Sequence, residues 1–440
     1  MINQCKIIGC LFFLGSGLHA RSQQMLTVEQ AVAAAIENNY DIQLLRNDSA
    51  LAALNNSYAY AAILPRLNAG TGIIFNNNNI RQKLVDGSER KQGGLKSHNV
   101  NASVNLNWTI FDGFKMFATR DKLAEILRLG ELNIKNQLVN TVADVIKTYF
   151  NIVRQKQQLI AIEEQMHLNE DRVTQAQKKL GVGLGAKPEL LQAKLDLNAQ
   201  IAARLKQQTL IEQLKEQLNQ LMIMAEETRY EVADSIPVRN DLQVTDILMK
   251  AEKNSPELQV ALQNIKIAQL TLKERKAEKY PTLSVNSAYN FSRTENQLVV
   301  NTFTPLLNRN KGFNYGLSTV IPIFNGFTVK RQIKAAQLDI DYQKILYNYQ
   351  KWRMDIAIKN AFKDYELQKK TLRLEDENML LAKENVYISR ERLRLGVTTY
   401  LELRETQKSL EDAYNRLIAA RYDSKVAETE LLRLKGELVR

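Results

Sequence analysis

Apolar residues recur every seven positions through a long helical run from about Lys115 to Leu180. A strict seven-residue repeat is typical of helices that pack along a coiled seam rather than of an isolated surface helix. At a rise of about 1.5 Å per residue, this run predicts a helix of roughly 100 Å. The chain then turns at Gly183 and comes back with a second apolar series, which predicts a helical hairpin. The seam positions are Leu138, Val145, Ile152, Leu159, Met166, Val173 and Leu180.

The seam pattern occurs twice along the chain. Ile358 follows Val145 by 213 residues (358 − 145 = 213), and Gly396 follows Gly183 by the same interval (396 − 183 = 213). An internal repeat of this size indicates two copies of one structural unit. We therefore expect a second long hairpin, with seam positions at Ile358, Tyr365, Leu372, Met379, Val386 and Leu393.

Upstream of each hairpin, the pattern changes to strict alternation. From Val100 to Ile110, apolar residues alternate with Asn, Ser and Thr, and three further runs follow the same rule. Each run is about ten residues long, which is typical of a transmembrane β-strand with lipid on one side and water on the other. A soluble antiparallel sheet packed on a core is the alternative. The amide-rich face and the aromatic residues favour the membrane. The positions expected to face lipid are Val104, Leu106, Trp108, Val285, Tyr289, Tyr315 and Leu317.

Two similar tetrapeptides are expected to turn the chain from strand to long helix. They read Phe111-Asp112-Gly113-Phe114 and Phe324-Asn325-Gly326-Phe327. Glycine permits a sharp change of direction that other residues resist, so Gly113 and Gly326 are the predicted strand–helix junctions.

These patterns divide the chain into a leader and two repeats. Lys6 followed by the apolar run Ile7–Leu18 is typical of an export signal, with cleavage expected after Ser22 or Ala20. The polar stretches 76–97 and 292–311 are expected to be loops. The predicted signal covers 1–22. Repeat 1, at 23–225, is predicted to contain short helices, strands 67–76 and 98–110 and a hairpin at 115–222. Repeat 2, at 226–440, is predicted to contain short helices, strands 283–292 and 312–321 and a hairpin at 328–437.

Four strands are too few to close a membrane barrel, because the smallest single-chain barrels use about eight. An open sheet edge in lipid leaves backbone groups unsatisfied at a cost of several kcal/mol each. Several copies of the chain must therefore share one barrel. Three copies would give twelve strands, although the sequence pattern fits two or four copies as well.

The composition of the chain limits which kinds of binding site and catalysis we expect. The chain has 440 residues and a net charge of +12, but its Lys and Arg residues are interleaved with Glu and Asp along the helices. This arrangement is typical of a solvated helical surface, so no nucleic-acid partner is expected. Both cysteines, Cys5 and Cys10, lie in the signal, and only His98 and His167 follow it. With no catalytic motif, metal cluster or phosphate loop, we expect no enzyme activity, cofactor or metal site.

The repeat, the two junctions and two hairpin-tip motifs together resemble the TolC family of outer-membrane efflux proteins over nearly the whole chain after the signal. The tips read Val182-Gly183-Leu184-Gly185-Ala186-Lys187-Pro188-Glu189 and Leu393-Arg394-Leu395-Gly396-Val397-Thr398-Thr399-Tyr400-Leu401-Glu402. The resemblance implies a mostly α-helical homotrimer with a twelve-stranded β-barrel in the outer membrane of a Gram-negative bacterium. A periplasmic helical barrel would continue below it. The implied partners are outer-membrane lipid, a periplasmic adaptor (membrane fusion protein) and an inner-membrane pump of RND, ABC or similar type.

The resemblance also assigns roles to the tips. Val182, Gly183, Leu184, Leu395, Gly396 and Val397 would contact the adaptor, whereas the glycines alone would also suit ordinary helix C-terminal caps. Glu402 and Glu405 lie three residues apart on one helical face and would form a periplasmic gate that binds cations. The alternative is a solvated helix start, where acidic residues are favoured by the helix dipole. Arg404 and Arg394 are the expected local partners of this acidic pair.

The sequence therefore predicts a passive channel of a tripartite efflux or type I secretion system, with porin activity. The alternative is a non-conducting periplasmic coiled-coil scaffold or adaptor. Adaptors have one helical hairpin and a soluble β-domain, whereas this chain predicts two hairpins and four lipid-type strands. Nothing in the sequence identifies the cargo.

Overall fold

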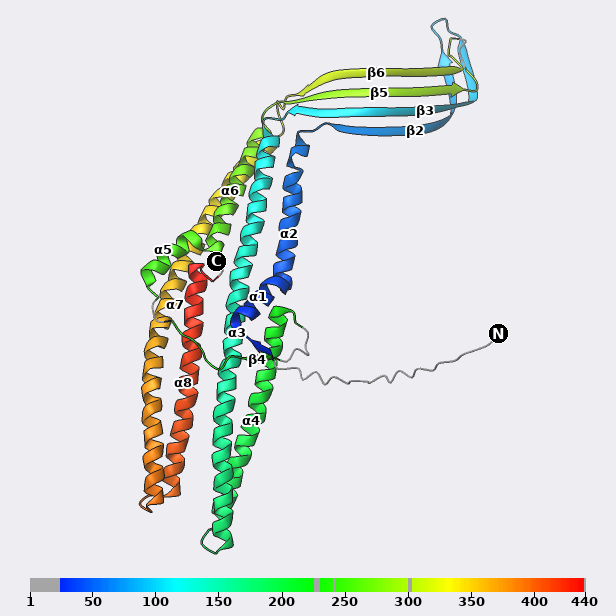
Figure 1. The fold of residues 1–440 in the computed structure, drawn as a ribbon. Helices are drawn as coiled ribbons and strands as arrows, with labels where there is room; N and C mark the ends of the chain where they lie inside the picture. The colour runs from blue at the N-terminus through cyan, green and yellow to red at the C-terminus, as the bar shows by residue number, and fades with distance from the viewer. Residues whose placement is uncertain (1–23, 225–229, 240–241, 300–302, 439–440) are drawn as a thin grey trace, which may run out of the picture.

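The computed structural model describes residues 24–224, 230–239, 242–299 and 303–438. The predicted export signal at residues 1–22 lies outside the described residues. The chain is elongated, with a four-stranded sheet at one end and long helices that run away from it (Figure 1). Within the described ranges, every helix is either too short or too polar to be a candidate membrane span.

The two repeats have matching elements in the same order. The long helices α3 and α7 each have 67 residues, and the returning helices α4 and α8 each have 36. Repeat 1 contains β1 (Gln24–Leu26), α1 (Val28–Asn38), α2 (Tyr40–Ser57), η1 (Ala59–Ala62), β2 (Arg66–Lys83), β3 (Glu89–Phe111), α3 (Lys115–Gly181) and α4 (Lys187–Met222). Repeat 2 contains β4 (Tyr230–Val232), α5 (Val244–Asn254), α6 (Pro256–Ala277), β5 (Thr282–Asn296), β6 (Leu307–Val320), α7 (Thr328–Arg394) and α8 (Tyr400–Lys435).

The four long strands form one antiparallel sheet in the order β2-β3-β5-β6. The strands are longer than the sequence pattern predicts, and the expected loop at 76–97 is largely a continued β-ladder. Only residues 84–88 turn between β2 and β3, where the Leu84 N–H donates to the Ser88 carbonyl at 2.8 Å. The loop prediction was wrong because a sequence rich in Asn and Lys indicates exposure to water but does not exclude a β-strand. Backbone hydrogen bonds, which do not depend on the side chains, hold these residues in the β-ladder.

The predicted seams lie inside the helical part. Val145, Ile152 and Ile358 are fully buried, and every other predicted seam position is at least half-buried. Around Val145 and Ile152 the core also takes in α1 and residues of α4, including the fully buried Leu218 and Met222. Heptad spacing therefore identifies the contact line between the paired helices, where burial of apolar side chains stabilises the hairpins.

The segment that connects the two hairpins at the start of repeat 2, residues 230–239, is attached to both of them by buried tyrosine hydroxyls. The Tyr149 hydroxyl donates to the Leu26 carbonyl at 2.7 Å and accepts from the Ala233 N–H at 3.1 Å. The Tyr365 hydroxyl donates to the Arg239 carbonyl at 2.8 Å. Both tyrosine side chains are fully buried, so water cannot hydrogen-bond to their hydroxyls, and the backbone groups are their partners instead. The segment thus ties the two repeats together at mid-height.

We expect Tyr149→Phe to lower the free energy of unfolding by roughly 1–3 kcal/mol, because it removes the hydrogen bonds to the Leu26 carbonyl and from the Ala233 N–H. Thermal and chemical unfolding of the purified protein, followed by circular dichroism, would measure the loss. Tyr387→Phe, at an exposed position of α7 outside the core, is the matched control and should change little. Equal stability of the two variants would contradict a bracing role for Tyr149.

Candidate functional site

The seven positions expected to face lipid lie on one face of the sheet. Residues directly opposite each other on neighbouring strands share a face. Trp108 opposes Val285, which opposes Leu317 on the other side, and Val104 opposes Tyr289. Leu106 and Tyr315 both oppose Ser287 and complete the set.

The opposite face of the sheet is lined by small and amide-bearing side chains. Asn107 opposes Asn286, Asn105 opposes Ala288, and Ser103 opposes Asn290. The sheet therefore separates an apolar surface from a polar one, as the alternation predicts.

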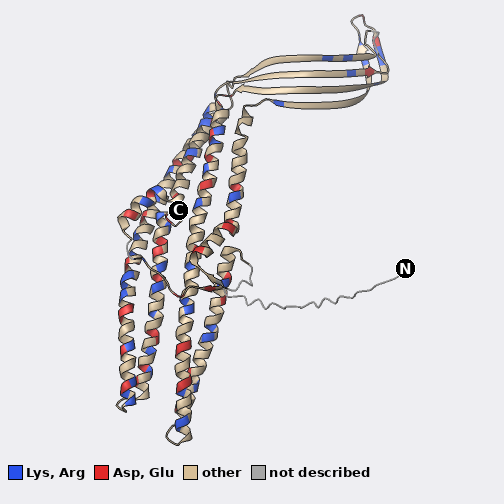
Figure 2. Cartoon of the chain, viewed as in Figure 1, with Lys and Arg blue, Asp and Glu red and all other residues tan. Residues whose placement is uncertain are grey.

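Charged residues are excluded from a continuous band across the sheet (Figure 2). The band reads 67–80, 99–111, 282–292 and 312–320 on the four strands, and it contains no Asp, Glu, Lys or Arg. Strand segments of roughly ten residues have the length that crosses a bilayer core when tilted. The Trp108 indole N–H, near the helical end of the band, donates to the Ile63 carbonyl at 2.7 Å.

The chain changes direction at Gly113, between the end of β3 and the start of α3. Gly113 has φ +71°, and a Cβ there would lie 2.4 Å from the Ala277 carbonyl oxygen. Only glycine combines this backbone conformation with so close an approach. Immediately before it, the Asp112 carboxylate accepts from the Met116 N–H at 3.0 Å and caps the start of α3.

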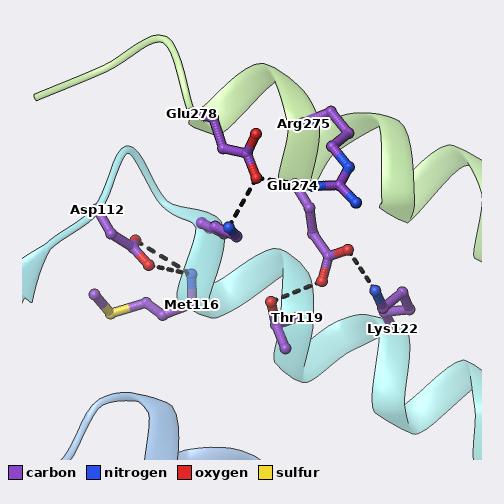
Figure 3. Close-up of polar contacts among 8 residues, drawn as sticks. Asp112, Met116, Thr119, Lys122, Glu274, Arg275 and Glu278 are labelled. Carbon is purple, nitrogen blue, oxygen red and sulfur yellow. Dashed lines mark hydrogen bonds and ion pairs between the residues drawn. The ribbon is translucent and has the colours of Figure 1, made fainter. Parts of the chain in front are cut away.

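Ion pairs hold the start of α3 against the end of α6, as Figure 3 shows. The Lys115 ammonium lies 2.8 Å from Glu278, the Thr119 hydroxyl donates to Glu274 at 2.7 Å, and Lys122 also pairs with Glu274. Burial acts to raise the pKa of Glu278, but the Lys115 ammonium and a neighbouring guanidinium outweigh it and hold the pKa below its ordinary value. On the repeat 1 side, side-chain contacts therefore join the start of α3 to the end of α6.

The second junction is uncovered in the single chain. Gly326 has φ +59°, yet a Cβ there would meet no atom of the described chain within 4 Å. The reason is position: α3 packs against both α2 and α6, whereas α7 packs against α6 and stands at the flank of the helices.

The predicted tip residues form the two turns at the far end of the hairpins. Gly183 has φ +77° and Gly396 has φ +75°, and each directly follows the C-cap residue of its helix. The Leu184 N–H donates to the Lys179 carbonyl at 2.9 Å, and the Val397 N–H donates to the Arg392 carbonyl at 3.0 Å. The apolar side chains beside the glycines, Val182, Leu184, Leu395 and Val397, are between 63% and 83% exposed.

Glu402 and Glu405 lie in the first turns of α8, but in different surroundings. The Arg392 guanidinium donates to Glu402 at 2.7 Å, and the Thr398 hydroxyl also bonds this carboxylate. Glu405 is exposed and forms no ion pair with another described residue. The expected partners were wrong: Arg394 pairs with Glu391 at 3.0 Å.

Arg404, the other expected partner, instead joins a latch between the hairpins that sequence reasoning missed. Its guanidinium lies 3.1 Å from Asp196 on α4, which also binds Arg172 of α3 at 3.3 Å. The Tyr400 hydroxyl donates to Gln175 at 2.7 Å. The α8 residues stand more than 200 residues from their partners on α3 and α4, so no local pattern could have paired them. We call Tyr400, Arg404, Gln175, Asp196 and Arg172 the hairpin latch.

The two histidines that follow the predicted export signal each lie beside one carboxylate. His98 lies 2.9 Å from Glu295, and His167 lies 3.1 Å from Glu170. Throughout the part of the chain that the structure describes, no group of three or more His, Cys, Asp or Glu side chains is placed to hold a metal ion.

The family model described as "Outer membrane efflux protein" matches residues 31–222 and 247–437. The outer membrane efflux protein BepC of Brucella suis is 25% identical over 204 residues, which cover 44% of this chain and 41% of that relative. The chain therefore spans less than half of BepC. The outer membrane protein TolC of Escherichia coli is 20% identical over 405 residues, covering 89% of this chain and 78% of TolC.

The fold resembles solved structures of outer membrane channels. The CmeC outer membrane channel of Campylobacter jejuni superposes with a TM-score of 0.77 at 16% identity. The match covers 93% of this chain and 85% of that chain. At this identity, the likeness shows a common fold.

Proposed function

The chain belongs to the outer membrane efflux protein family, and we propose that it forms a passive channel through the outer membrane of a Gram-negative bacterium. The observation that carries the proposal is the charge-free band across a sheet with one apolar and one polar face, joined to helices that extend far beyond it. The apolar face would contact lipid and the amide-rich face would line a water-filled passage. The helices would continue that passage through the periplasm.

Closure of the channel requires several copies, which we propose are three. β2 and β6 are the edge strands, so each has a ladder partner on one side only. Pairing β6 of one copy with β2 of the next satisfies both edges, and three four-stranded sheets give a twelve-stranded barrel. An exposed apolar stripe on α7 supports this arrangement, because α2 of the next copy would cover it as α2 covers α3 within one chain. The stripe contains Leu338, Tyr342, Ile345, Tyr349 and Trp352.

The tips are proposed to dock a periplasmic adaptor, which would join the channel to an inner-membrane pump of RND, ABC or similar type. Exposed apolar side chains at the two tips are costly in water unless a partner covers them. Energy and choice of cargo would come from the pump.

The acidic pair is proposed to form the periplasmic gate. Threefold symmetry would bring Glu405 of each copy around one axis, where like charges repel unless cations bind between them. The hairpin latch would hold this end closed, because it fixes α8 against α3 and α4.

We expect Val104→Arg to reduce membrane assembly strongly, because an Arg on the lipid face near the bilayer midplane costs about 2–4 kcal/mol. Asn105→Arg, one residue further along β3, should be tolerated because its side chain would reach water. The amount of heat-resistant oligomer in the isolated outer membrane measures both. Fractionation of the wild type with soluble periplasmic proteins would favour a scaffold, and equal assembly of the two variants would show that the faces are misassigned.

We expect the double variant Leu184→Asp, Val397→Asp to lose export and adaptor binding while keeping its oligomer. These side chains are exposed, so the change adds charge to the contact without straining the glycine caps. Co-purification of the adaptor and accumulation of a pump substrate in cells are the measurements. Val85→Asp, the same kind of change at the opposite end of the molecule, is the control. Normal export by the tip variant would place the docking surface elsewhere.

We expect divalent or hexa-ammine cations added from the periplasmic side to block current through channels in planar bilayers. Glu405→Gln should weaken the block by about tenfold, equivalent to about 1.4 kcal/mol. Glu402→Gln should have a smaller effect, because Arg392 already neutralises that carboxylate. An unchanged block in the Glu402→Gln, Glu405→Gln double variant would return the pair to a solvated helix start.

A further inference from the structure

Cations gather at one end of the apolar sheet face, just outside the charge-free band. Arg293 on β5 directly opposes Arg309 on β6, and Lys311 opposes Phe291. These positions alternate in step with Tyr289 and Phe313, so they belong to the same face as the apolar residues. Figure 2 shows the positive residues of β5 and β6 only in the half of the sheet farther from the helices. We call Arg293, Arg309 and Lys311 the cation row.

The row lacks enough negative charge to balance it within the chain. Directly opposed residues on antiparallel strands have Cβ atoms about 4.5–5.5 Å apart, and like charges there are destabilising. Glu295 pairs with Arg293, and it is shared with His98 at 2.9 Å. Arg309 and Lys311 are exposed and form no ion pair with another described residue. An external anion would relieve the repulsion.

The outer edge of the charge-free band places the row relative to a bilayer. On this face of β5, Phe291 is the last residue of the band, and it directly opposes Lys311. Membrane strands have aromatic side chains where the apolar band ends. The cation row begins at this edge, on the side away from the helices, which is the level of the headgroups of the outer leaflet.

We propose that the cation row binds the phosphate groups of an anionic, phosphorylated glycolipid of the outer leaflet. Arginine presents a planar fork of donors that matches phosphate oxygens, and two opposed arginines with a nearby lysine can hold one phosphate from several sides. The acyl chains would lie along the apolar face below. This inference rests on the proposed membrane insertion of the sheet. Because β6 is an edge strand, the lipid would sit beside the junction between copies and stabilise it.

Other exposed cations on the strands are arranged differently. At the turn between β2 and β3, Arg81 lies 2.9 Å from Glu89, and Lys91 lies 3.7 Å from the same carboxylate. Arg66 begins β2 and opposes Asn107 of the polar face, and Lys279 lies between α6 and β5, so both are at the end of the sheet nearer the helices. This last pair offers a control that removes the same number of positive charges away from the cation row.

The test uses the full-length protein, delipidated in a non-ionic detergent and reconstituted into vesicles of neutral phosphatidylcholine. Binding of a labelled bis-phosphorylated glycolipid is compared with its dephosphorylated form. We expect the Arg309→Gln, Lys311→Gln variant to bind the phosphorylated form about tenfold or more weakly than the wild type, since it loses two charge-assisted contacts. The Arg66→Gln, Lys279→Gln control should match the wild type, and Arg309→Lys should retain most of the binding.

Heat resistance of the oligomer provides a second readout. The phosphorylated glycolipid should raise it for the wild type and the control, and much less for the double row variant. Equal binding by all variants, or equal binding of both glycolipid forms, would overturn the proposal. Displacement of the lipid by equimolar inorganic phosphate would show a free-anion site and overturn it too.

Vesicle flotation separates this inference from the proposed function. If the wild type does not insert into neutral vesicles, the channel proposal fails and the lipid site fails with it. If the wild type and the row variants insert equally, unequal lipid binding supports the site, whereas equal lipid binding removes the site and leaves the channel proposal intact.

Discussion

The unpaired edges of the four-stranded sheet are the constraint on which the rest of the molecule depends. β2 and β6 each present a row of backbone donors and acceptors without a strand partner. Water can satisfy such an edge, but a bilayer core cannot. Within the proposed membrane location, the sheet therefore has to close through other copies of the chain. The same closure would cover the apolar stripe on α7 and the open surface beside Gly326, so one requirement accounts for three uncovered features.

The two repeats share their elements but differ in their neighbours. Gly113 is enclosed by the end of α6, whereas Gly326 is open, although both begin a 67-residue helix after a similar tetrapeptide. The difference follows from order along the chain: α3 has a helix on each side, and α7 is last at its flank. Duplication thus leaves the first junction enclosed and the second uncovered, and the proposed contact with a further copy would cover the second.

Ion pairs and side-chain hydrogen bonds connect the helices at several places along the length of the molecule. At the strand–helix junction, Glu274 and Glu278 are matched by lysines, and at the far end the hairpin latch joins α8 to α3 and α4. Between them, the buried hydroxyls of Tyr149 and Tyr365 hold the connecting segment. On the sheet, charges are absent from a band and unbalanced just beyond it. Glu405, Arg309 and Lys311 form no ion pair with another described residue, and ligands outside the chain are proposed for them.

Periodicity along the sequence determined the helices, the strands and their faces. A repeat of seven or of two positions indicates which side of a helix or strand is apolar, and that side is the one removed from water wherever the element lies. The burial of Val145 and Ile358 and the two faces of the sheet around Val104 could therefore be predicted from the sequence. The duplication and the family followed from the same patterns. Only the tertiary structure decided the partners of charged and polar side chains. Arg404 meets Asp196, and Arg293 opposes Arg309, because helix stagger and strand register set which residues of distant segments are level with each other. A long polar side chain finds its partner within a few ångströms, and that distance depends on the packing of whole elements rather than on any local spacing.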